Sequence, residues 1–220
     1  MGGFRLKKLS INPKKLYEGC MYAAIVHAVT VGQYPELNYE HSWDGYNYSM
    51  NNSQGCRATI TFHPEYIIAV FQERTNIDIN RSAYDYLTDM PDDILKIAES
   101  EALAYVLQNV SGETRPIITA AFWGTWDELS SNQSWENILQ SGGFILENQL
   151  LNHEQSLQSW TDYYELNNDE IKLIESLFER KMKNGDSRIY LSAEEAKILS
   201  GDIGECKESL RELNIFLPDD

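Results

Sequence analysis

The chain has 220 residues, of which 42% are hydrophobic, and it carries a formal net charge of −16. This composition argues against global disorder, because the chain has enough apolar side chains to bury a core. We expect no membrane span, since the most apolar run, residues 20–31, is shorter than the roughly 20 residues that cross a bilayer. The N-terminal sequence MGGFRLKKLS lacks a signal-peptide pattern, and the three cysteines are far apart, so a cytoplasmic protein is expected.

The charge is unevenly distributed along the chain. Residues 1–83 hold 8 basic and 7 acidic side chains, whereas residues 84–220 hold 10 basic and 27 acidic ones, a net charge of −17. An acidic field of this strength repels nucleic acids and anionic membranes and attracts a basic partner. An acidic surface that only keeps the protein in solution is the simpler alternative.

The N-terminal half predicts an antiparallel sheet, because apolar and polar residues alternate in short runs that turn residues separate. We expect strands over residues 4–11, 37–43, 57–62, 66–71 and 116–123. Two helices are expected in the same half. One covers the apolar run 20–31, whose length favours a helix although a buried strand is the alternative, and the other begins at Pro91 and ends near Gly112.

The C-terminal half predicts mainly helices. Asn152 and Asn168 each precede an amphipathic run that they can cap, and Ser192 with Glu195 matches a capping box. Short helices are also expected at residues 135–139 and 206–213. The predicted fold is therefore α+β, with an antiparallel sheet of four to five strands, helices packed on one face, and a helical C-terminal half. We expect regions 1–130 and 131–220 to pack together as one domain.

Common catalytic signatures are absent from the sequence. It contains no glycine-rich phosphate loop, nucleophile elbow, zinc-protease motif or EF-hand loop. Antiparallel strand geometry is expected to separate His41 and Asp44 from His63, so no metal site is predicted. A Cys56 thiolate with His41 as its base is a further possibility for an enzyme. We expect no cofactor, and an enzyme stays an alternative hypothesis.

A polar, aromatic stretch over residues 43–55 is the first candidate binding surface. We interpret it as a long loop that combines aromatic side chains with asparagine, serine and glycine, which is the composition of many paratopes. The predicted contact residues in this stretch are Trp43, Asp44, Tyr46, Asn47 and Tyr48. Folding of these aromatic rings back onto the sheet is the alternative.

A second candidate surface follows the strand expected at residues 116–123. Trp126 is followed by Asp127 and Glu128, and this aromatic–acidic combination suits an arginine-rich partner through cation–π contacts and ion pairs. Burial of the tryptophan in the core is the alternative reading.

These features favour an acidic, non-enzymatic binding protein that associates with a basic protein partner and neutralises it. An immunity protein, an antitoxin or a mimic of nucleic-acid charge has this character. Direct binding to nucleic acid or membrane is not expected, because basic residues are few and scattered. The alternatives are an enzyme with an unfamiliar site and a scaffold that docks another chain through the helices at 152–183.

Overall fold

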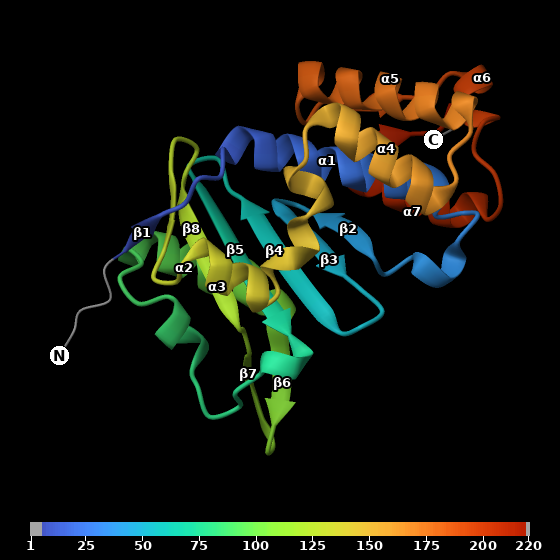
Figure 1. The fold of residues 1–220 in the computed structure, drawn as a ribbon. Helices are drawn as coiled ribbons and strands as arrows, with labels where there is room; N and C mark the ends of the chain where they lie inside the picture. The colour runs from blue at the N-terminus through green and yellow to red at the C-terminus, as the bar shows by residue number, and fades with distance from the viewer. Residues whose placement is uncertain (1–5, 219–220) are drawn as a thin grey trace. The chain divides into compact units, whose positions relative to one another are not determined.

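The computed structural model describes residues 6–218 and confirms the α+β class (Figure 1). The main sheet has seven strands rather than four to five, in the order β1-β9-β8-β5-β4-β3-β2. These strands are β1 (Lys7–Lys8), β2 (His41–Asp44), β3 (Asn47–Asn51), β4 (Cys56–Phe62), β5 (Tyr66–Glu73), β8 (Ala120–Thr125) and β9 (Leu129–Ser131). The two strands that were not predicted, β3 and β9, are short, and β3 carries asparagine or serine at three of its five positions.

The chain divides into two compact units, each built from two segments. The first unit contains the chain up to Leu16 together with Tyr46–Glu147, and the second contains Tyr17–Gly45 together with the chain from Asn148 onward. Strand β2 belongs to the second unit, and the other six strands of the sheet belong to the first. The expected division near residue 130 stays a prediction, because compactness alone does not show which segments fold independently.

The first unit is organised around the antiparallel meander β3–β4–β5, which was predicted in part. Strand β4 pairs with β5 so that Cys56 lies opposite Glu73, and β5 pairs with β8 so that Tyr66 lies opposite Thr125. Strand β8 therefore rejoins the meander, as expected for the apolar run at 116–123. Of the strand expected at 4–11, residues 7 and 8 form β1, while residues 4 and 5 lie outside the described part of the chain.

The two faces of β5 and β8 are both buried. On one face, Ile68, Val70 and Trp123 pack with α2 (Asp92–Ser100) and the 3-10 turns η3 (Ala83–Tyr86) and η4 (Ala102–Val106). On the other face, a Cβ on Gly142 would lie 3.1 Å from Phe71, which places the segment of α3 (Trp135–Gln140) and η5 (Gly143–Leu146) there. Helical cover thus extends to both faces, beyond the single face expected.

Three sequence predictions in this region were wrong in detail. Residues 37–43 do not form one strand, since the 3-10 turn η1 (Pro35–Leu37) precedes the shorter β2. The loop expected at 43–55 is interrupted by β3, whose polar side chains bond to distant partners. The helix expected to reach Gly112 ends at Ser100, and the hairpin of β6 (Leu107–Val110) and β7 (Glu113–Pro116) follows η4.

The second unit is mainly helical, as predicted for its C-terminal part. Besides η1 and β2, it contains α1 (Pro13–Thr30, of which the first four residues belong to the first unit), the 3-10 turn η6 (Asn148–Leu150), α4 (His153–Tyr164), α5 (Asn168–Asn184), α6 (Ala193–Ala196), α7 (Ile203–Glu212) and the parallel pair β10 (Ile189–Tyr190) and β11 (Ile215–Phe216). Side-chain caps begin the helices where the sequence indicated them. Asn152 caps α4, and Asn167, one residue earlier than expected, caps α5.

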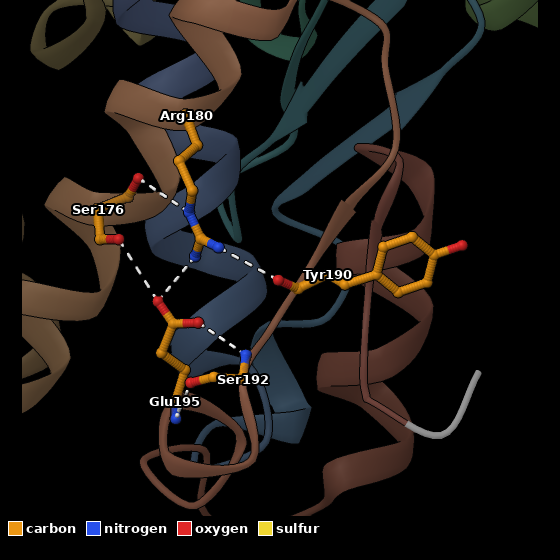
Figure 2. Close-up of polar contacts among 5 residues, drawn as sticks. All are labelled: Ser176, Arg180, Tyr190, Ser192 and Glu195. Atoms are coloured by element: carbon orange, nitrogen blue, oxygen red, sulfur yellow. Dashed lines mark hydrogen bonds and ion pairs between the residues drawn. The ribbon is translucent and has the colours of Figure 1, made fainter.

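The capping box at Ser192 and Glu195 is confirmed and has a second function (Figure 2). The Ser192 hydroxyl accepts from the Glu195 amide at 3.1 Å, and the Glu195 carboxylate accepts from the Ser192 amide at 2.8 Å. The same carboxylate forms an ion pair with Arg180 at 2.8 Å, and Arg180 also donates to the Tyr190 carbonyl. Glu195 therefore joins the start of α6 to α5 and β10.

Within residues 6–218 no helix combines the length and the apolarity that crossing a bilayer would need.

Candidate functional site

The eight residues predicted to bind a partner fall into two groups. Tyr48 is 0% exposed, and Asn47 and Trp43 are buried as well. Asp44, Tyr46, Asp127 and Glu128 are exposed, and Trp126 is half-buried.

The buried members of this set stabilise the fold. Tyr48 lies opposite Ile60 in the β3–β4 register, so its ring points to the Phe71 face of the sheet. The Asn47 amide donates to Glu101 at 2.6 Å and accepts from the Thr61 hydroxyl at 2.7 Å. Both residues are therefore unavailable to a partner, which corrects two of the predicted contacts.

Trp43 also has a structural role, within the second unit. Its indole nitrogen donates to the Gly45 carbonyl at 3.0 Å, and its ring meets that of Tyr17 edge-on at 6.0 Å. Its backbone amide donates to the Glu212 carboxylate at 2.8 Å, and burial raises the pKa of Glu212. We conclude that Trp43 packs into its unit.

Tyr46 and Trp126, from the two separate candidate surfaces, converge on one histidine in the first unit. The Tyr46 and His63 ring centroids are 5.7 Å apart, and the His63 ring stacks on Tyr66 at 5.9 Å. The Trp126 indole donates to the His63 carbonyl at 3.0 Å. We call the four residues Tyr46, His63, Tyr66 and Trp126 the aromatic cluster.

Strand ends position the aromatic cluster. Tyr46 immediately precedes β3, and its carbonyl accepts from the amide of Phe62, the last residue of β4. His63 follows β4, Tyr66 begins β5, and Trp126 follows β8 directly after the partner of Tyr66, Thr125. Because antiparallel strands alternate in direction, these four positions meet at one end of the sheet.

One carboxylate contacts the aromatic cluster, and two more lie next to it in the chain. Glu65 and Asp127 are exposed beside His63 and Trp126 in the chain, and the Tyr66 hydroxyl donates to Asp93 at 2.6 Å. That hydrogen bond is the main cause that holds the pKa of Asp93 below its usual value. Glu128 forms an ion pair with Lys8, so part of the local negative charge is already compensated. The cluster is thus an aromatic surface with an acidic rim.

Two members of this cluster were not predicted as binding residues. His63 was considered only as a metal ligand, and Tyr66 only as the first residue of a strand. The aromatic residues at both ends of the His63-Pro64-Glu65 turn were the available signal, since side chains at a tight hairpin project from the end of a sheet. Their proximity to Trp126 depends on the β5–β8 pairing, which local sequence does not encode.

The second unit contains a buried polar cluster that includes His41, one of the possible catalytic residues. The His27 and His41 rings meet at 5.3 Å, the Tyr164 hydroxyl lies 3.3 Å from His27 Nδ1, and Glu40 accepts from Tyr163 at 2.8 Å. Burial lowers the pKa of His27 to about 4 and lowers that of His41 well below its usual value. Both imidazoles are therefore neutral at physiological pH and packed among aromatic rings.

Cys56 and its surroundings lack the features of an activated nucleophile. Burial raises the pKa of the Cys56 thiol to about 12, which opposes the thiolate that a nucleophile needs. Its sulfur lies 3.5 Å from the Gly142 carbonyl, not beside a histidine. Among residues 6–218, histidine, cysteine and carboxylate side chains form no group of three or more that could hold a metal ion.

Comparison with protein-family models, with curated proteins and with solved structures finds no match. No relative or fold neighbour therefore supports a function by analogy.

Proposed function

We propose that this protein is an acidic, non-enzymatic binding protein that holds a basic protein partner on the aromatic cluster. The observation that carries the proposal is the convergence of Tyr46, Tyr66 and Trp126 around His63, at a sheet end rimmed by carboxylates. Tyrosine and tryptophan are the residues that most often dominate the energy of protein interfaces.

The chemistry of the aromatic cluster suits cationic side chains. Arginine and lysine bind over aromatic faces, and each such contact contributes about 0.5–1 kcal/mol at an exposed site. Exposed Glu65 and Asp127 can pair with the same cations, and the net charge of −17 over residues 84–220 attracts a basic protein from a distance. Long-range attraction and short-range aromatic contact thus favour the same kind of partner.

Neutralisation of the partner is the role that we propose for this binding. An acidic protein that covers a basic surface competes with the nucleic acid or other polyanion that the surface would otherwise bind. An immunity protein, an antitoxin or another inhibitor acts in this way. The proposed compartment is the cytoplasm.

Affinity capture from the native cell, at low and at high salt, tests the proposal. We expect wild-type protein to retain a basic protein at low salt and to release it at high salt, since rim charges are screened. Tyr46→Ser removes a ring that is 45% exposed and is expected to reduce the retained amount severalfold. Tyr39→Ser is the matched control, because Tyr39 is 44% exposed but lies in the other unit.

Two results would contradict the proposal. One is capture that resists high salt or that selects acidic proteins. The other is an equal loss of capture for Tyr39→Ser and Tyr46→Ser, which would show that the aromatic cluster has no special role. Thermal unfolding of each variant verifies that the substitution has not unfolded the protein.

A further inference from the structure

A groove in the first unit lies between the helical segment 83–106 and the β6–β7 hairpin, and the aromatic cluster does not contribute to it. It holds about 190 Å³ and is lined by Tyr84, Glu99, Leu103, Ala104, Leu107 and Pro116. This volume is below the roughly 300 Å³ at which pockets for whole small molecules begin. The groove therefore has the size for a single side chain.

The lining combines an apolar floor with one polar end. Leu103 is buried, whereas Leu107, the first residue of β6, is 49% exposed and leaves apolar surface in the groove. At the polar end, the Tyr84 hydroxyl donates to Glu99 Oε1 at 2.9 Å, so an aromatic ring and a carboxylate are held side by side. A carboxylate accepts several hydrogen bonds, and the bond from Tyr84 uses only part of this capacity.

The electrostatic surroundings of the groove favour a cation. Residues 77–116 contain eight acidic and three basic side chains, a net charge of −5. Two of the three basic side chains have partners within the segment. Arg81 lies over the Tyr86 ring at 3.8 Å, and Arg115 donates to the Ile79 carbonyl. The same segment therefore already places a guanidinium on a tyrosine face, and the groove offers a second tyrosine, Tyr84, beside the Glu99 carboxylate.

We propose that the groove binds an arginine side chain of the basic partner, a proposal that rests on the proposed function. The aliphatic stem of the arginine lies on Leu103, Leu107 and Pro116, and the guanidinium pairs with Glu99 beside the Tyr84 ring. Arginine fits better than lysine, because its planar, weakly hydrated head group stacks on aromatic rings and bonds a carboxylate through two N–H groups. The groove is then a second contact site that selects one side chain.

Amide NMR spectra of the full chain, titrated with Nα-acetyl-arginine amide, test this assignment directly. We expect shifts concentrated at residues 84, 99, 103–107 and 116, and much smaller shifts with the neutral citrulline analogue. Glu99→Gln should weaken binding about fivefold, the effect of losing roughly 1 kcal/mol from an exposed ion pair. Glu113→Gln is the matched control, because it removes the same charge from the neighbouring hairpin outside the groove.

The outcomes separate this proposal from the function on which it rests. Shifts at Tyr46, Tyr66 and the Trp126 indole, without shifts at the groove, would overturn the groove and leave the aromatic cluster as the binding surface. Groove shifts that persist unchanged in Glu99→Gln, or that citrulline reproduces, would overturn the assignment of arginine. Groove binding of the arginine probe combined with an empty affinity capture would instead count against the proposed function.

Discussion

Protonation of the buried histidine pair should destabilise the second unit as the pH falls. His27 is 1% exposed, and burial lowers its pKa from 6.5 to about 4. Above pH 6.5 the histidine is neutral in the folded and the unfolded chain, so it adds no pH dependence there. Between pH 6.5 and about 4 the unfolded chain takes up a proton that the folded chain does not, and stability decreases.

The size of this effect follows from the shift in pKa. At about 1.36 kcal/mol per pH unit, a change from 6.5 to about 4 removes about 3 kcal/mol of unfolding free energy. Titratable groups near His27 include His41, Tyr164, Glu40 through Tyr164, and Glu212, which lines the same small cavity. Glu40 has the opposite effect on the unfolding free energy. Burial raises its pKa, so its charged form destabilises the folded chain at high pH, and protonation at lower pH removes this cost. The effect of His27 must therefore be measured as a difference between variants.

Urea unfolding, followed by circular dichroism from about pH 7 to about pH 4, gives this difference. Wild-type protein should lose about 3 kcal/mol more than His27→Gln over this range, because the substituted amide side chain does not titrate and Glu40 is common to both proteins. Val29→Ala is the control, since it removes buried methyl groups from the same helix without changing a titrating group. Equal pH dependence in wild type and His27→Gln would refute the reasoning.

Three further substitution and labelling experiments test the packing. All three cysteine thiols are buried with raised pKa values, so Ellman's reagent should label them only after denaturation, and rapid labelling of the native protein would contradict this. Gly124→Ala places a Cβ 2.0 Å from the Glu128 carbonyl oxygen and should cost about 1–3 kcal/mol in thermal unfolding, whereas an unchanged midpoint would show that β8 and β9 adjust freely. Ser192→Ala removes the cap of α6 and should cost about 1 kcal/mol, and Ser192→Thr should restore most of it.

Much of the fold could be predicted because helix caps and strand alternation depend on residues that are close together in the sequence. The capping residues Asn152 and Ser192 satisfy amides three positions away, so the pattern alone identifies the helix starts. The apolar alternation of residues 57–62 likewise identified β4. In contrast, β3 was missed because Asn47 and Ser49 are poor strand formers whose partners, Glu101 and Thr59, lie on other elements.

The candidate site was only partly predictable for a similar reason. Exposed Tyr46 and half-buried Trp126 were identified from composition, but their common neighbour His63 depends on the pairing of β5 with β8, since Trp126 bonds to it from 63 residues away in the sequence. Composition also cannot tell which face of a strand a residue occupies, and Tyr48 was therefore included although its ring is buried. A shift of the strand register by one residue would turn the Tyr48 side chain to the opposite face of the sheet.

Site-specific photo-crosslinking in the native cell tests the central claim most directly. Asp127, exposed next to Trp126 of the aromatic cluster, is replaced by p-benzoylphenylalanine, and Tyr39, exposed in the other unit, is replaced in the same way as a control. If a basic partner binds the aromatic cluster, the probe at position 127 should form an adduct with a basic protein, and Tyr46→Ser in the same chain should suppress the adduct. No adduct at position 127, or an adduct with an acidic protein that Tyr46→Ser leaves unchanged, would contradict it.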